Sequence, residues 1–245
     1  MLEISHLSKR YGETIALEDA SIVFAAGSVH TIMGENGSGK STLVKLLSGI
    51  VTPDRGAIRI DGASFAGRTP AAFQSRRVAT VFQEVLIAPD RTVIDNVLLG
   101  YDPPFRRRMP RSGRREAVRE ALSRCSPTAV DLDAEAGRLP LATQQLVVLA
   151  RAFIRKPRIL ILDEVTAALD FNDRETVFRL IEGLAREGCL ILFISHRMDE
   201  VMRLSHRITV LRSGKVVETI DRADATPELL LQRMAPEIVA ERQHG

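Results

Sequence analysis

The stretch Gly34-Glu35-Asn36-Gly37-Ser38-Gly39-Lys40-Ser41 fits the pattern G-x-x-x-x-G-K-[ST] and directly follows the apolar run Val29–Met33. Glycines in this pattern let backbone N–H groups turn inward around a polyphosphate, and the helix that opens at Lys40 points the positive end of its dipole at the same anion. We expect Lys40 to reach the β and γ phosphates and the Ser41 hydroxyl to coordinate Mg²⁺. Apolar residues continue at helical spacing after the motif, at Leu43, Leu46 and Leu47. The stretch therefore predicts a nucleotide-binding loop between a strand and a helix.

The size of the chain sets the domain organisation that we expect around this loop. At 245 residues the chain is long enough to bury one sizeable core, and the loop lies too near the N-terminus to leave a separate domain before it. Lys and Arg exceed Asp and Glu by 34 − 31 = 3, a balance too small to indicate a nucleic-acid groove or a membrane-surface patch. We expect one α/β domain with an inserted subdomain.

The cysteines and the N-terminus bear on the compartment. Cys125 and Cys189 show no pairing pattern, and Cys189 falls in an apolar run, so we expect free thiols and a reducing cytoplasm. The N-terminus lacks a charged segment followed by an apolar one, and no uninterrupted apolar run approaches the ~18 residues that a membrane span needs. The sequence predicts a chain that does not span a membrane itself.

Before the loop, strand-like patterns cover residues 2–7 and 20–24, with a turn at Tyr11-Gly12 between them. Tyr11 has two interpretations of equal weight: its ring stacks on a base, or it is a partly exposed turn residue. After the first helix, residues 57–62 alternate between two turns and predict an antiparallel hairpin near the nucleotide.

Polar side chains follow three apolar strand patterns where each strand ends. Residues 78–82 end in Gln83, residues 159–162 in Asp163-Glu164, and residues 190–194 in Ser195-His196. An α/β sheet presents its ligand groups at such ends. Beside a triphosphate, Asp163 can hold Mg²⁺ while Glu164 orients or deprotonates the attacking water.

The segment from Pro89 to about Lys156 changes to helical periodicity and predicts an inserted helical subdomain, with helices near residues 92–99, 112–124 and 141–154. Within it, residues 106–115 are rich in arginine but contain no aromatic residue, which favours a solvated loop over a nucleic-acid platform. Beyond it we expect a helix over 172–186, strands over 207–211 and 215–220, and a terminal helix that begins at Thr226-Pro227-Glu228.

From Leu2 to about Met234 the chain closely resembles the nucleotide-binding subunit of ABC transporters. The stretch Ile194-Ser195-His196-Arg197-Met198-Asp199-Glu200-Val201, together with Phe82-Gln83-Glu84, resembles most the importers of ribose-type and other monosaccharides. The resemblance implies an α/β fold: a P-loop NTPase core with an antiparallel β subdomain and an inserted helical subdomain at about residues 85–156. Residues 1–245 would form this single domain.

The resemblance also implies a role for each site residue. Tyr11 would stack on adenine, Gln83 would sense Mg²⁺ and the transport domain, Glu164 would be the catalytic base, and His196 would contact the γ-phosphate. Residues 167–170 would cross a dimer interface. The metal would be held by Ser41, Gln83 and Asp163. ATP would bind through the loop residues Gly34, Glu35, Asn36, Gly37, Ser38, Gly39, Lys40, Ser41 and Thr42.

The signature motif of this chain differs from the sequence usual in the family. Members usually read Leu-Ser-Gly-Gly-Gln or a sugar-importer variant, and this chain reads Leu139-Pro140-Leu141-Ala142-Thr143-Gln144-Gln145. In the family this signature caps the nucleotide of the partner subunit. Proline has neither a hydroxyl nor an N–H, although its fixed φ suits a helix start, so we expect the helix to form and a phosphate contact to be lost. Val165 likewise replaces a proline usual after the catalytic carboxylate.

The expected function is the ATP-binding and hydrolysing subunit of an importer for a sugar or similar small polar solute. It would act with a separate transmembrane permease, as a homodimer or with a second ATPase subunit, on the cytoplasmic face of the membrane and without a specific nucleic-acid partner. Three alternatives remain open: an ABC ATPase in nucleic-acid or translation work, an exporter subunit, and a nonhydrolytic or regulatory ATP-binding partner. The defective signature favours the last, whereas Glu164 and His196 favour hydrolysis.

Overall fold

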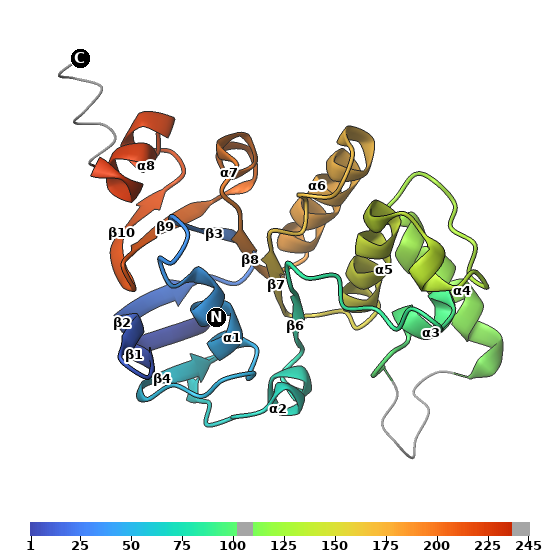
Figure 1. Ribbon diagram of the computed structural model, residues 1–245, viewed down its shortest axis with the longest axis horizontal. Coiled ribbons are helices and arrows are strands. Elements are labelled where there is room, and N and C mark those ends of the chain that lie inside the picture. The colour runs from blue at the N-terminus through green and yellow to red at the C-terminus, as the bar shows by residue number, and fades with distance from the viewer. Residues whose placement is uncertain (102–109, 237–245) are drawn as a thin grey trace.

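The strands of this computed structural model, which describes residues 1–101 and 110–236, form two sheets (Figure 1). The larger sheet has the strand order β10-β9-β3-β8-β7-β6. Its strands are β3 (Val29–Met33), β6 (Val78–Val81), β7 (Ile159–Asp163), β8 (Leu190–Ile194), β9 (Arg207–Arg212) and β10 (Lys215–Asp221). The smaller sheet has the order β2-β1-β4-β5. Its strands are β1 (Leu2–Tyr11), β2 (Thr14–Phe24), β4 (Arg55–Ile60) and β5 (Ala63–Ser64).

The larger sheet is parallel except for β10, which pairs antiparallel with β9. Every residue of β3, β7 and β8 is buried, because helices or the smaller sheet cover both faces of these strands. Parallel strands end at one edge of their sheet. The segments after β3, β6, β7 and β8, which carry the loop and the expected strand-end groups, therefore lie along the same edge.

The helices occupy distinct regions of Figure 1, where α3, α4 and α5 lie together on the right, inserted between β6 and β7. One buried cluster runs continuously from these helices to a face of the larger sheet. The division of the chain into a core and an inserted subdomain stays a prediction. The helices are α1 (Lys40–Leu47), α2 (Pro70–Ser75), α3 (Val93–Val97), α4 (Arg111–Ser123), the 3₁₀ helix η1 (Ala136–Arg138), α5 (Leu141–Phe153), α6 (Phe171–Arg186), α7 (Met198–Leu204) and α8 (Pro227–Met234).

The core on the other face of the larger sheet fixes α1, the helix after the phosphate-binding loop. Leu43, Leu46 and Leu47 are buried in one cluster with residues of the larger sheet, such as Ile161, and of the smaller sheet, such as Leu2. Helix α1 is thereby held between the two sheets, so that burial of its apolar face stabilises the position of the loop before it. The helical spacing predicted from the sequence is confirmed.

Several elements differ from the sequence expectations. The hairpin predicted at residues 57–62 is present as β4 and β5, but β4 pairs with β1, on the side away from β2, and it is β2 that approaches the loop. Helices α2 and α7 were not predicted, because each is short, at 6 and 7 residues, and a helical period is hard to recognise over fewer than two full turns. Cys125 and Cys189 are free and buried, as expected.

Within residues 1–101 and 110–236, we find no helix that combines the length and the apolar character needed to span a bilayer.

Candidate functional site

The phosphate-binding loop has the close-packed backbone that its glycines predict. A Cβ at Gly34 would lie 2.3 Å from the carbonyl oxygen of Leu211 and 2.4 Å from Ser38 Oγ. Gly39 precedes α1 with φ 104°, and a Cβ there would lie 2.6 Å from the carbonyl oxygen of Ala16 in β2. Both positions therefore require glycine, because backbone atoms of neighbouring strands approach too closely for a side chain.

Lys40 is buried at the start of α1, and its ammonium group lies across its own loop. Its Nζ donates hydrogen bonds to the carbonyl oxygens of Gly34 at 2.7 Å and Glu35 at 2.8 Å. Burial lowers the pKa of Lys40, and the negative charges of Glu164, Asp163 and Glu35 oppose that shift. Lys40 therefore lies in the electrostatic field of both strand-end carboxylates, although they are far away in the sequence.

Two polar groups at this edge fit a bound polyphosphate and its metal. Ser38 Oγ is buried and has no hydrogen-bond partner within residues 1–101 and 110–236, so a ligand oxygen would satisfy it. Asp163 ends β7 and is buried, and its pKa is raised to about 6 by burial and by the charge of Glu164. A cation beside this carboxylate would offset the free-energy cost of burying its negative charge.

The protein oxygens at this edge suit a Mg²⁺ ion that is shared with the phosphates of a nucleotide better than a metal ion bound by protein side chains alone. Across the described ranges, no group of three or more His, Cys, Asp or Glu side chains could hold a metal ion. Mg²⁺ is bound in nucleotide sites through one or two protein oxygens together with the phosphates. The hydroxyl of Ser41 and the carboxylate of Asp163 are donors of that kind, and Gln83 brings an amide oxygen.

Glu164 is the meeting point of the other predicted site residues. Its carboxylate is largely buried, with 16% of the side chain exposed, and its Oε1 lies 3.4 Å from Nδ1 of His196. Nε2 of Gln83 donates to its Oε2 at 3.3 Å. The structure thus brings together a carboxylate, an imidazole and an amide from the ends of β7, β8 and β6, as the strand-end argument predicted.

The backbone at Glu164 has an uncommon conformation for a residue with a side chain. Its φ is 51°, in the left-handed region, which costs on the order of 1 kcal/mol for such a residue. The N–H of Glu164 donates to the carbonyl oxygen of Ile194 in β8 at 3.0 Å. The turn after β7 is therefore fixed to the strand that leads to His196.

Tyr11 lies at the end of β1, on the hairpin that leads into β2. Its side chain is exposed, and Lys9 Nζ lies 5.6 Å from the centre of its ring. This position suits either interpretation of the residue, so stacking on a base stays a prediction.

The variant signature segment forms the expected helix start. Pro140 is the N-cap of α5 with φ −53° and ψ 148°, and no side chain caps the helix there. Gln144 Nε2 donates to the carbonyl oxygen of Leu139 at 2.8 Å. Residues 167–170 lead into α6, where Asp170 accepts a hydrogen bond from the N–H of Asp173 at 2.8 Å. The roles expected for these segments at a dimer interface stay predictions.

The basic segment at residues 106–115 falls partly outside the described residues, which resume at 110. Within α4, Arg115 forms paired hydrogen bonds with the carboxylate of Asp133 at 2.7 and 2.8 Å. That arginine is engaged within the protein, and the absence of a specific nucleic-acid partner stays a prediction.

A buried polar cluster next to the site residues in sequence was assigned no role in the sequence analysis. Thr166, two residues after Glu164, and Ser195, directly before His196, both donate to the carboxylate of Glu200 in α7. The sequence signal was weak, because Glu200 lies in a charged stretch typical of an exposed helix start. Only the tertiary fold brings Glu200 to the residues that adjoin Glu164 and His196 in the sequence.

The arrangement can bind a polyphosphate and act on a water molecule beside it. Backbone N–H groups and the dipole of α1 attract the anion, and Lys40 adds a full positive charge. A carboxylate held between an amide and an imidazole can orient water or accept its proton.

Residues 17–167 match the family model described as "ABC transporter". The chain is 40% identical over 228 residues to "Ribose import ATP-binding protein RbsA 1" of Rhizobium etli, an alignment that covers 93% of this chain and 44% of that protein. It is 36% identical over 250 residues to "Arabinose import ATP-binding protein AraG 1" of Burkholderia cenocepacia, covering 99% of this chain and 48% of that protein. The chain thus spans less than half the length of these curated relatives.

A solved structure supports the same relationship in three dimensions. An ATP-binding cassette, solved as a dimer in a post-hydrolysis state with ADP and Pi, aligns with a TM-score of 0.82 at 26% identity. The alignment covers 91% of this chain and 99% of that chain. The predicted fold class, an α/β P-loop NTPase core, is confirmed.

Proposed function

This protein belongs to the ABC transporter family, since the family model covers more than half of the chain, and we propose that it binds and hydrolyses ATP to energise an importer. The solute would be a sugar or a similar small polar molecule, and it would pass through a separate membrane permease. The names of the ribose and arabinose import relatives support this solute class.

The observation that carries the proposal is the environment of Glu164. Its two carboxylate oxygens lie 3.4 Å from His196 Nδ1 and 3.3 Å from Gln83 Nε2, while its charge acts on buried Lys40 of the phosphate-binding loop. A carboxylate in this environment suits the activation of a water molecule in line with a terminal phosphate.

Each group then has a task in hydrolysis. Loop N–H groups and Lys40 bind the β and γ phosphates, Glu164 orients the attacking water and accepts its proton, and His196 donates a hydrogen bond to the γ-phosphate. Ser41 and Asp163, with Gln83, would hold Mg²⁺, and the chemistry that the ion would supply there is neutralisation of charge on the phosphate oxygens. Tyr11 stacks on the adenine.

A cavity of about 370 Å³ between α2, β6 and α5 supports a permease as partner. Its lining is mainly apolar and includes Phe82, which adjoins Gln83, and the exposed Leu99, with Arg151 and Arg155 at the α5 side. A permease segment in this groove would lie beside a site residue, which gives the two subunits a direct connection. Such docking would hold the protein at the cytoplasmic face of the membrane.

Uptake of labelled sugars in cells that lack the gene tests the proposal. Wild-type protein is expected to restore uptake of a pentose or a related sugar, whereas Glu164→Gln is expected not to. Glu187→Gln, at the exposed end of α6, is the matched control and should restore uptake. Equal restoration by Glu164→Gln would refute the catalytic role, and failure with every sugar tried would refute the solute class.

The groove has a separate test. Leu99→Glu places a charge on an exposed side chain of the lining and is expected to abolish uptake while ATP hydrolysis by the purified protein is kept. Leu231→Glu, which is similarly exposed but lies on α8, should leave uptake intact. Unchanged uptake with Leu99→Glu would refute docking at this groove.

A second candidate function is a nonhydrolytic or regulatory partner in an asymmetric ABC heterodimer. Pro140 favours it, since the N-cap of α5 lacks a side-chain hydroxyl. The assembled groups around Glu164 argue for hydrolysis at the site built on this chain, so we rank this candidate second.

A further inference from the structure

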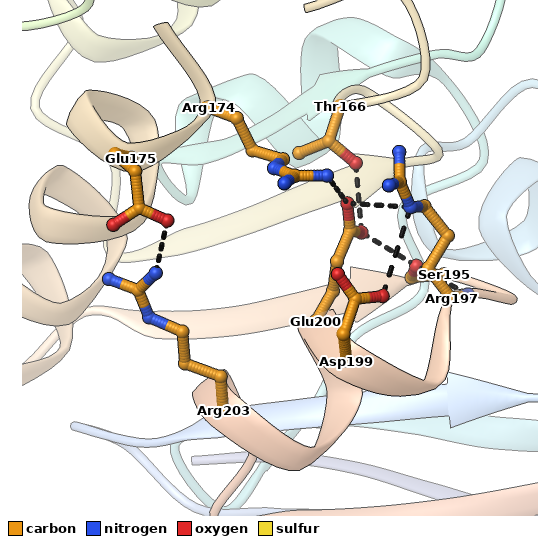
Figure 2. A network of polar contacts seen from close by, with 8 residues as sticks. All are labelled: Thr166, Arg174, Glu175, Ser195, Arg197, Asp199, Glu200 and Arg203. Carbon is orange, nitrogen blue, oxygen red and sulfur yellow. Dashed lines mark hydrogen bonds and ion pairs between the residues drawn. The ribbon is translucent and has the colours of Figure 1, made fainter. Parts of the chain in front are cut away.

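A buried carboxylate joins segments of the chain that adjoin the proposed catalytic residues in sequence (Figure 2). Glu200 of α7 is 0% exposed, and its Oε2 accepts hydrogen bonds from Thr166 Oγ1 at 2.9 Å and from Ser195 Oγ at 2.8 Å. Ser195 Oγ in turn accepts from the N–H of Arg197 at 3.1 Å. One carboxylate oxygen therefore holds the turn after β7 to the end of β8.

The other oxygen of Glu200 lies near two guanidinium groups but makes no hydrogen bond within the described residues. Its Oε1 lies 3.5 Å from Nε of Arg197 and 4.0 Å from Nη1 of Arg174, which belongs to α6. A buried carboxylate is retained at a cost unless nearby groups compensate it. Two hydroxyl donors and two guanidinium groups supply that compensation, so the cluster strongly favours one arrangement of its parts.

The cluster is directly linked to the two groups whose separation matters for water activation. Thr166 lies two residues after Glu164, whose backbone is in the left-handed region, and Ser195 is the residue before His196. The backbone joins these segments through the hydrogen bond from the N–H of Glu164 to the carbonyl oxygen of Ile194. Glu200 adds a buried side-chain link between them through Thr166 and Ser195.

We propose that Glu200, through Thr166 and Ser195, is a positioning residue that sets the separation between the carboxylate of Glu164 and the ring of His196. The proposal rests on the function proposed above. Its hydroxyl links restrain the turn after β7 against the end of β8, so that both side chains reach the same water and phosphate. Small displacements of catalytic groups lower rates strongly while binding, which depends on the loop, is kept.

The test is Thr166→Val, which removes the hydroxyl with little change of shape, together with Thr166→Ser, which keeps it. We expect Thr166→Val to lower kcat for Mg-ATP by about tenfold or more, with unchanged affinity for a fluorescent ATP analogue. Thr166→Ser, which keeps the hydroxyl, should have a kcat near that of the wild-type protein. The NMR signal of the His196 ring, assigned with His196→Gln, should shift in Thr166→Val and return in Thr166→Ser.

Glu175→Gln is the matched control, because it breaks the ion pair with Arg203 that also joins α6 and α7 but touches neither Thr166 nor Ser195 (Figure 2). It should change neither kcat nor the His196 signal. If Thr166→Val does not fold, Glu200→Gln gives the same readouts without loss of volume.

The outcomes separate the two proposals. A Thr166→Val protein with the wild-type rate and an unmoved His196 signal overturns the positioning role. If the wild-type protein hydrolyses no ATP either alone or together with its permease and any second ATPase subunit, the proposed function fails, and the His196 signal still decides whether Glu200 fixes the ring. An equal shift in Glu175→Gln would mean that general packing of α7, and not this link, holds His196.

Discussion

Replacing Pro140 by serine restores the hydroxyl that the family signature usually carries, and the structure allows its effect to be estimated. Pro140 is the N-cap of α5 in an extended conformation, with φ −53° and ψ 148°. Serine is a preferred N-cap residue in this region of backbone space, so Pro140→Ser needs no rearrangement of the helix start. The new side chain would also cap N–H groups of the first turn.

Two separate effects are expected. The cap contributes about 1 kcal/mol, but the loss of proline frees the unfolded chain and offsets about 0.4–1 kcal/mol of it, so Tm should change by less than roughly 2 °C. In an assembled dimer, a restored donor to the transferring phosphoryl group should raise the rate of hydrolysis at the partner's site by ~10²-fold, or roughly 3 kcal/mol of barrier.

The assay is phosphate release with the permease, measured for this subunit alone and then with any second ATPase subunit. A large gain for Pro140→Ser alone indicates a homodimer limited by its signature. No gain alone, with high activity only in the mixture, indicates an asymmetric pair in which this chain supplies one complete phosphate-binding site. Ordinary transporter rates for the wild-type protein alone, unchanged by Pro140→Ser, would refute the reasoning about the missing hydroxyl.

Two further predictions concern the phosphate-binding loop and the metal. Lys40→Ala is expected to abolish Mg-ATP binding in calorimetry, since its ammonium is the main side-chain charge facing the β and γ phosphates, and equal affinity would reject the nucleotide site. Asp163→Asn is expected to raise Tm of the nucleotide-free protein at pH 7.5, because burial and the charge of Glu164 raise the pKa of this carboxyl to about 6. With an unfolded pKa of about 3.9, the wild-type protein loses stability as pH rises between about 4 and about 6, so the advantage of the variant should vanish below that range in melting curves across pH. A constant difference at all pH values would contradict this assignment, and the variant should also lose the Mg²⁺ dependence of its ATP affinity.

The sequence predicted the parts of the site that depend on local signals. The loop motif, its helix, and the polar residues at the ends of β6, β7 and β8 could be located because each follows an apolar run of strand length. Because parallel strands end at a common edge, Gln83, Glu164 and His196 could be expected together, and their contacts are present in the structure. The free state of both cysteines followed from their spacing.

Other features depend on tertiary packing and left no such signal. The burial of Glu200 is set by α6, the turn after β7 and the end of β8, which are distant in sequence. The pairing of β4 with β1, away from the strand that approaches the loop, is a choice among antiparallel partners that alternation alone does not make. The role of Tyr11 depends on where a base lies, which neither periodicity nor an exposed ring determines.

The central claim is that Glu164 serves as the base for ATP hydrolysis at a site built on this chain. It is tested most directly by single-turnover phosphate release, with purified protein in excess over labelled Mg-ATP. We expect the wild-type protein to release phosphate in a Mg²⁺-dependent reaction, and Glu164→Gln to bind ATP with similar affinity while it releases none above the blank, because the amide keeps the shape and loses the base. Phosphate release by Glu164→Gln at the wild-type rate would contradict the claim.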